Sequence, residues 1–171
     1  MSIAVNISAL QFELDDISQF VADTLERTGL PAHRLEIEVT ESVLVDNRDY
    51  VAGELRAIAE LGCGVAIDDF GTGYSSLTYL ADFPFTKIKI DRSFVIKMEE
   101  NHQAGAIVST IIALSQSLGA KTIAEGVETE EQATLLRAAG CQSVQGFLYG
   151  RPEPLKFEND NGTKTSGLRI A

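Results

Sequence analysis

Apolar and polar residues alternate along several short segments of the chain. Between positions 35 and 40, for example, Leu, Ile and Val alternate with Glu, Glu and Thr. Because successive side chains of a strand point to opposite faces, such a segment predicts a strand with one aliphatic and one polar face. Six strands are expected, at Ile3–Ser8, Arg34–Thr40, Gly64–Asp68, Lys87–Asp91, Lys121–Ala124 and Gln142–Phe147.

Longer segments between these strands carry apolar residues at helical spacing, and several of them end at a glycine. Helices are expected at Asp16–Thr28, Arg48–Leu61, Ser76–Ala81, His102–Leu118 and Glu130–Ala139. A strand that is regularly followed by a helix is typical of a parallel α/β sheet.

Two parallel architectures fit this order of elements. In a doubly wound sheet both faces of each strand meet helices, so the strands are almost continuously aliphatic. The segments 3–8, 35–40 and 87–91 instead keep a polar face, which a barrel with a polar mouth explains. A half-solvated antiparallel sheet would also alternate, but not with helical crossovers. We therefore expect a TIM-like (β/α)8 barrel.

The length of the chain conflicts with a complete barrel. Eight βα units need about 250 residues, whereas this chain has 171 residues. We expect an incomplete barrel domain over 1–155, whose two open edges favour self-association unless a partner or further chain completes it. The segment 156–171 shows little apolar periodicity, so a polar, disordered tail is expected there.

Composition narrows the function classes. The net charge of −11 argues against a nucleic-acid groove, although a carboxylate site that holds metal ions can still take a small phosphorylated ligand. No stretch approaches the about 20 apolar residues of a membrane span, and no signal peptide is recognisable. Cys63 and Cys141 form no CxxC pair, so buried reduced thiols in a cytoplasmic protein are expected. His33 and His102 lie far apart, which disfavours a histidine metal site.

The run from Ala66 to Leu77 carries the strongest chemical signal. Asp68 and Asp69 follow a short apolar strand, and two glycines and a serine pair come after them. Two interpretations fit this run alone. It is either a polar turn with Ser75 or Ser76 as a helix cap, or a pair of oxygen ligands for a divalent cation.

Other polar residues stand at the ends of the remaining predicted strands. In a closed parallel barrel these ends meet at one mouth, where catalytic groups lie. Oxygen donors without His or Cys suit Mg²⁺ or Mn²⁺, and a pair of such ions is a common device for hydrolysing a phosphodiester. The strand-end residues are Asn6, Glu38, Asp68 with Asp69, Lys89, Glu125 and Gln145.

Six motifs in this order and spacing closely resemble those of EAL-type cyclic-di-GMP phosphodiesterases. The resemblance runs from Val5 to about Leu155 and implies an EAL-type (β/α)8 barrel that hydrolyses cyclic-di-GMP to linear pGpG with Mg²⁺ or Mn²⁺. The motifs are Val5-Asn6-Ile7-Ser8, Glu38-Val39-Thr40-Glu41-Ser42, Asp68-Asp69-Phe70-Gly71-Thr72-Gly73, Lys87-Ile88-Lys89-Ile90-Asp91, Ala124-Glu125-Gly126-Val127-Glu128 and the segment from Gln145 to Pro152.

The resemblance also implies roles for individual residues. Lys89 is expected to orient the nucleophilic water, with Glu125 and Asp68 as the other catalytic residues. Asp68 is expected to bridge two metal ions. The implied metal ligands are Asn6, Glu38, Asp68, Asp69 and Glu125.

Further motif residues are expected around this centre. Gln145, Glu128 and Asp91 are expected to support the ligands or contact the substrate, and Glu41 resembles the anchor of the loop that follows Asp69. The segment 71–81 resembles the family's dimer-forming element, so a homodimer is expected there or through the open edges. The loop itself comprises Phe70, Gly71, Thr72 and Gly73.

One departure from the family pattern is plain. The Glu-Ala-Leu tripeptide, whose glutamate is a metal ligand in the family, does not occur in this sequence. The chain resembles the family from the third strand onward. Weak or absent turnover is therefore expected, and three interpretations stay open: an enzyme, a module that binds cyclic-di-GMP or metal without turnover, and a dimerisation module.

Overall fold

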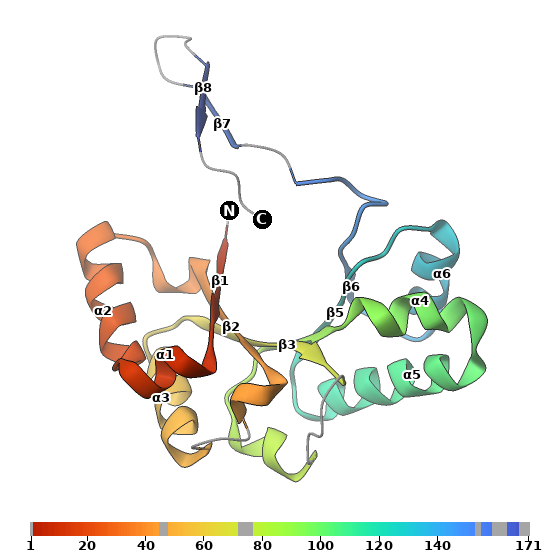
Figure 1. The fold of residues 1–171 in the computed structure, drawn as a ribbon, viewed down its shortest axis with the longest axis horizontal. Helices are drawn as coiled ribbons and strands as arrows, with labels where there is room; N and C mark the ends of the chain where they lie inside the picture. The colour runs from red at the N-terminus through yellow and green to blue at the C-terminus, as the bar shows by residue number, and fades with distance from the viewer. Residues whose placement is uncertain (1, 45–47, 72–76, 153–154, 159–163, 168–171) are drawn as a thin grey trace.

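The computed structural model describes residues 2–44, 48–71, 77–152, 155–158 and 164–167. One six-stranded parallel sheet forms its centre, with the strands in the same order in space as in sequence (Figure 1). Each crossover thus returns the chain to the neighbouring strand, as in a barrel wall. The strands are β1 (Ile3–Ile7), β2 (Leu35–Thr40), β3 (Gly64–Phe70), β4 (Lys87–Ile90), β5 (Lys121–Ala124) and β6 (Ser143–Val144).

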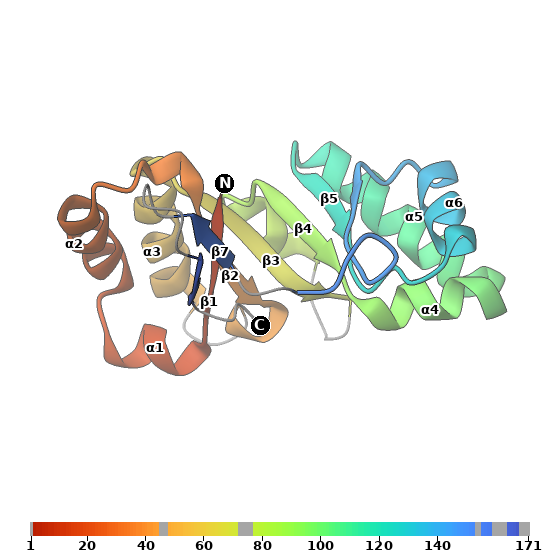
Figure 2. The same cartoon turned by 90° about the horizontal axis from the view of Figure 1, so that it is seen from above.

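Helices connect the strands and lie on one side of the curved sheet, α2 and α3 beside β1 and β2, and α4 to α6 beside β4 to β6 (Figures 1 and 2). Local capping fixes their starts. The Asp16 carboxylate accepts from the Gln19 N–H before α2, and Thr129 and Gln132 form a capping box at α6. The helices are α1 (Ala9–Leu14), α2 (Ile17–Thr28), α3 (Arg48–Glu60), α4 (Arg92–Glu100), α5 (His102–Ser117) and α6 (Glu130–Ala138), with 3₁₀ turns at Ala32–Arg34, Glu41–Leu44 and Leu77–Asp82.

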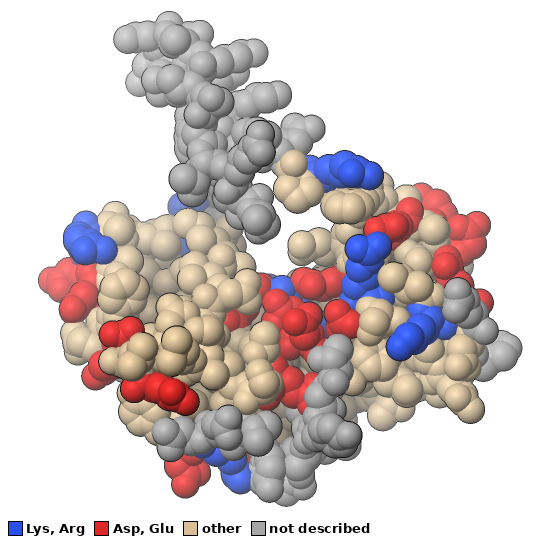
Figure 3. All heavy atoms as spheres, viewed as in Figure 1, with Lys and Arg blue, Asp and Glu red and all other residues tan. Residues whose placement is uncertain are grey.

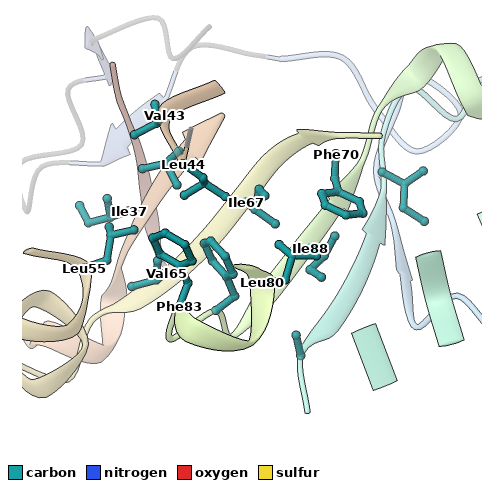
Figure 4. Packing of buried hydrophobic residues seen from close by; sticks show 14 of the residues in the cluster. Ile37, Val43, Leu44, Leu55, Val65, Ile67, Phe70, Leu80, Phe83 and Ile88 are labelled. Atoms are coloured by element: carbon teal, nitrogen blue, oxygen red, sulfur yellow. The ribbon is translucent and has the colours of Figure 1, made fainter. Parts of the chain in front are cut away.

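The aliphatic faces of the strands pack against these helices and form the core (Figure 4). Ile37 and Val65 lie near Leu55 of α3, while Ile67 and Ile88 extend the cluster toward Phe70. Burying each of these large side chains contributes about 1.5–3 kcal/mol. Because this face is aliphatic, the intervening polar side chains of β2 and β4 point to the opposite face.

Most predicted elements are confirmed to within a few residues, and the differences have local causes. Strand β3 runs two residues further than predicted, because its pairing with β4 shifts register between Ile67 and Phe70. Strand β6 is shorter than the predicted 142–147, since a turn begins at Gly146, whose carbonyl accepts from the Tyr149 N–H. The predicted helix at 76–81 is a 3₁₀ turn over Leu77–Asp82, and Ser76 lies outside the described residues.

Residues near the chain's end differ from the expectation of a disordered tail. β7 (Leu155–Glu158) and β8 (Lys164–Gly167) pair antiparallel in a separate two-stranded sheet. Sequence periodicity missed them because each strand has only four residues.

Strand β1 is an edge of the described sheet. It pairs with β2 alone within the described residues, and its Ile3 and Val5 side chains are 43% and 38% exposed. This edge agrees with the expected incomplete barrel. None of the helices in the described part of the chain is long and apolar enough to cross a membrane.

The two cysteines are free and differ in exposure, which corrects the expectation that both are buried. Cys63 is buried and Cys141 is half-buried. Burial raises the pKa of the Cys63 thiol, which lowers its reactivity further. We expect Ellman's reagent to titrate one thiol in the native protein and two after denaturation. Fast reaction of both thiols in the native state would contradict this packing.

Candidate active site

Carboxylates from three neighbouring strand ends converge on the ammonium group of Lys89. Its Nζ donates to Glu38 Oε2 at 2.9 Å, to Asp68 Oδ2 at 2.9 Å and to Glu125 Oε1 at 2.8 Å. Glu38, Asp68 and Lys89 lie on β2, β3 and β4, and Glu125 directly follows β5. Figure 3 shows acidic side chains gathered near the middle of this view, with basic ones beside them. The structure thus brings together four of the predicted site residues.

This cluster is largely shielded from water. The side chains of Lys89, Glu38 and Asp68 are 9%, 8% and 14% exposed. Burial alone would lower the pKa of Lys89, but its hydrogen bonds to the three carboxylates outweigh burial and raise that pKa above its ordinary value. Lys89 therefore remains an ammonium at neutral pH, which can orient a nucleophile or offset negative charge but cannot serve as a base.

Negative charge remains in excess around this ammonium. Burial raises the pKa of Glu125, and the negative charges of Asp68 and Glu38 raise it further. The hydrogen bond and the positive charge of Lys89 act in the opposite direction but do not cancel this effect. Burial, then the charges of Asp68 and Asp91, likewise raise the pKa of Asp69. Crowded carboxylates of this kind favour an additional cation.

The turn after Asp68 is shaped by its backbone. The Asp69 N–H donates to Asp68 Oδ1 at 2.9 Å, and Asp69 has a left-handed φ of 52°. Such a φ is uncommon outside glycine and is found at functional sites held by their surroundings. Gly71 follows with a φ of 98°, and a Cβ there would lie 2.9 Å from the Phe94 ring. Thr72, Gly73 and the serine pair lie outside the described residues.

The Glu41 side chain contacts this turn. Its Oε2 accepts from the Gly71 N–H at 3.0 Å, and its side chain is buried. Replacing Glu41 by Gln keeps the size of the side chain but replaces one carboxyl oxygen by an amide group, which changes its hydrogen bonding to the turn. We expect Glu41→Gln to lower turnover at this site by about tenfold through misplacement of Asp68 and Asp69. Unchanged turnover in a steady-state assay would show that Glu41 does not set the turn.

The other predicted site residues have different surroundings. Asn6 lies beside Glu38 in the register of β1 and β2. Asp91 caps α4 by accepting from the Ser93 N–H, and Glu128 pairs with Arg92 at 2.8 Å. Gln145 is fixed by its backbone, which donates to the Ala124 carbonyl and accepts from the Val127 N–H. Their predicted roles remain predictions.

Sequence reasoning missed two neighbours of the cluster. Lys87 Nζ lies 2.6 Å from Glu36, forming an ion pair one layer further from the strand ends than Lys89. Glu36 and Glu38 lie two residues apart on β2, as Lys87 and Lys89 do on β4, so each pair shares one face of its strand. This spacing could have predicted two layers of ion pairs, one above the other. Nothing in the sequence pattern singles out Arg92 as a functional residue, because it is one basic residue after a strand.

A divalent cation fits the chemistry of this site. Among the described residues, no three His, Cys, Asp or Glu side chains are disposed as a metal centre. The three carboxylates bonded to Lys89 offer only oxygen donors, and burial, with smaller contributions from neighbouring carboxylates, raises the pKa values of Glu125 and Asp69. Hard cations such as Mg²⁺ prefer such donors.

Comparison with known families and curated proteins gives a consistent result. Residues 1–152 match the family model described as the EAL domain. The chain is 48% identical over 154 residues to the uncharacterized protein y4lL of Sinorhizobium fredii, and 45% identical over 154 residues to the signaling protein YkoW of Bacillus subtilis. It is 46% identical over 153 residues to MucR of Pseudomonas aeruginosa, a bifunctional diguanylate cyclase/cyclic di-GMP phosphodiesterase. These alignments cover 90% of this chain but 19%, 19% and 22% of the relatives, so the chain spans about a fifth of their length.

Solved structures share the fold. The PaMucR phosphodiesterase in complex with c-di-GMP superposes with a TM-score of 0.85 at 46% identity, over 90% of this chain and 62% of that one. BlrP1 of Klebsiella pneumoniae, in a complex with manganese and c-di-GMP, gives a TM-score of 0.81 at 35% identity, over 88% of this chain and 39% of that one. The predicted fold class, an incomplete TIM-like barrel, is confirmed.

Proposed function

Because this chain belongs to the EAL domain family, we propose that it carries the reaction centre of a phosphodiesterase that hydrolyses cyclic-di-GMP to linear pGpG. The observation that supports this most directly is the convergence of Glu38, Asp68 and Glu125 on Lys89 at the strand ends. In barrel enzymes this is where catalytic groups lie. The chain's turnover on its own is weak, since its sequence lacks the Glu-Ala-Leu ligand.

The residues that would hold Mg²⁺ or Mn²⁺ are those with oxygen donors at this mouth, Asn6, Glu38, Asp68, Asp69 and Glu125. When bound, the cations would lower the pKa of water and offset the charge of the phosphodiester. The manganese and calcium complexes of BlrP1 with cyclic-di-GMP support a divalent ion here.

The chain's own groups supply position and charge. Lys89 donates hydrogen bonds from a fixed place, so it can hold the attacking water and offset charge that develops on the phosphoryl oxygens. Glu38 and Asp68 fix the direction of that ammonium. Glu41, by holding the Gly71 N–H, keeps the turn after Asp68 in place. Gln145, Glu128 and Asp91 would support the ligands or contact the substrate.

Self-association and location also belong to this proposal. The exposed Ile3 and Val5 at the β1 edge support association of two copies, there or through the segment 71–81. That segment lies mostly outside the described residues. The two free cysteines support a cytoplasmic location. Size-exclusion chromatography with light scattering tests association, and a stable monomer at high concentration would overturn it.

Separation of nucleotides after incubation tests the activity. With cyclic-di-GMP and Mn²⁺ at high protein concentration, we expect slow formation of pGpG that EDTA abolishes. Absence of pGpG under these conditions would overturn turnover by this chain.

A second candidate function is capture of cyclic-di-GMP without turnover. It is favoured by the ion pairs of Lys89, which engage three carboxylates that the metal ions would otherwise share. Calorimetry in Ca²⁺ tests it, since binding heat without pGpG would support capture. Neither heat nor thermal stabilisation by the nucleotide would overturn it.

A further inference from the structure

The turn that follows β5 carries Glu125 and is held from several directions. The Glu125 N–H donates to the Ile90 carbonyl at 3.0 Å, and the Val127 N–H donates to the Gln145 carbonyl at 3.0 Å. Further along, the Glu128 N–H donates to Gln132 Oε1 at 2.7 Å. Backbone hydrogen bonds thus hold the residues on both sides of Gly126.

Arg92, at the start of α4, covers Gly126. A Cβ built on Gly126 would lie 2.3 Å from Arg92 Cγ and 2.6 Å from its Cδ, so the aliphatic part of Arg92 lies directly on the glycine backbone. Gly126 has a φ of 68°, a left-handed conformation that glycine adopts without strain. The packed side chain of Arg92 opposes rotation of this flexible residue from the side where a Cβ would lie.

Both ends of α4 contact the same connection. At its start, the Arg92 guanidinium pairs with Glu128 at 2.8 Å. In its last turn, Glu99 accepts from Thr129 Oγ1 at 2.7 Å and from Gln132 Nε2 at 3.4 Å. Helix α4 therefore braces the connection from β5 to α6 along its length.

We propose that Arg92 is a positioning residue, which holds Glu125 against Lys89 through its packing on Gly126. This inference rests on the proposed function, since it assigns a role in the same reaction centre. Glu125 is 2.8 Å from Lys89 and is the residue before Gly126, so rotation at Gly126 displaces its neighbours along the turn. Displacement of a catalytic group by about 1 Å can cost about 100-fold in rate.

The aliphatic stem of Arg92 carries this role, and its charge adds little. The side chains of Arg92 and Glu128 are 53% and 40% exposed, and exposed ion pairs contribute little to stability. The stem, by contrast, is in direct contact with the backbone of the turn. Long basic side chains commonly pack through their methylene groups in this way.

Three variants separate the stem from the charge. Arg92→Ala removes both, Arg92→Met keeps an apolar stem without the charge, and Lys97→Ala removes another exposed cation of α4 as the matched control. Two readouts apply to each protein. One is kcat and KM for cyclic-di-GMP with Mn²⁺, and the other is hydrogen exchange of the Glu125 and Val127 amides by NMR.

We expect Arg92→Ala to lower kcat by 10- to 100-fold with little change in KM, and to lose exchange protection at both amides by about tenfold. Arg92→Met and Lys97→Ala should stay within threefold of the wild type. Unchanged exchange in Arg92→Ala, or equal losses in Arg92→Met, would overturn the role of the stem. If the wild-type chain shows no turnover, the proposed function fails, and the exchange data alone decide whether Arg92 positions this turn.

Discussion

Lys89→Met is expected to destabilise the protein by about 3 kcal/mol at neutral pH, because it leaves buried carboxylates without their cation. Lys89 donates to Glu38, Asp68 and Glu125, and its side chain is 9% exposed. Met has a similar length and fills the same space, so the loss reports charge and hydrogen bonds rather than a cavity. Urea denaturation at pH 7 measures the effect.

The pH dependence of this loss has a definite sign. Burial raises the pKa of Glu125, and Lys89→Met removes the hydrogen bond and charge that oppose this effect, so the folded variant binds protons more readily than its unfolded chain. The deficit of Lys89→Met relative to wild type should therefore shrink as the pH falls from 7 to 5. A deficit that is constant over this range would contradict a charge-based origin.

Lys87→Met is the matched control for this experiment. Lys87 lies two residues earlier on β4, pairs with Glu36 alone among the described carboxylates, and is 23% exposed. Lys87→Met removes one ion pair at a position that is more exposed to water, so we expect the free energy of unfolding to fall by about 1 kcal/mol. Equal losses of stability in the two variants would show that the three carboxylates around Lys89 do not depend on their cation more than Glu36 depends on Lys87.

Gly146→Ala is expected to destabilise the protein by about 3 kcal/mol, because the new methyl group meets backbone atoms. A Cβ on Gly146 would lie 2.1 Å from the Val127 carbonyl oxygen and 2.3 Å from the Val127 nitrogen. No side-chain rotation relieves such a contact. The clash also disturbs the hydrogen bonds from the Val127 and Leu148 N–H groups, which join this segment to the turn after β5. Thermal unfolding measures the loss.

Gly53→Ala is the control for Gly146→Ala. Gly53 lies inside α3, and a Cβ there meets nothing within 4 Å. Alanine in a helix interior is more favourable than glycine by about 0.5–1 kcal/mol, so this variant should be stabilised. Similar melting temperatures for the two variants would show that the close approach at Gly146 is not important.

Periodicity predicted the sheet well because the strands keep one aliphatic face. Residues such as Ile37, Val39 and Ile88 are fully buried, and their alternation with polar residues is visible in the sequence. The short helix α1 and the helix α4 were missed. Helix α1 has only six residues, which is too short for a clear helical periodicity. Helix α4 begins directly after Asp91, which the sequence assigns to the end of the preceding strand.

The sequence indicated which side chains share one end of the sheet, but not how they contact one another. Strand-end position was enough to place Glu38, Asp68, Lys89 and Glu125 at one mouth. That the three carboxylates all bond to Lys89 depends on distances between strands, which the sequence does not contain. The left-handed φ of Asp69 and the packing of Arg92 on Gly126 are likewise set by tertiary contacts.

Comparison of pGpG formation by the wild type, Lys89→Met and Lys87→Met tests whether this cluster is the reaction centre. With cyclic-di-GMP and Mn²⁺, at a temperature where all three proteins are folded, we expect slow turnover by the wild type and by Lys87→Met. Turnover by Lys89→Met should fall by at least about 100-fold, because the variant lacks the ammonium that we propose holds the nucleophile. Turnover by Lys89→Met equal to that of the wild type would contradict the assignment of this cluster as the reaction centre.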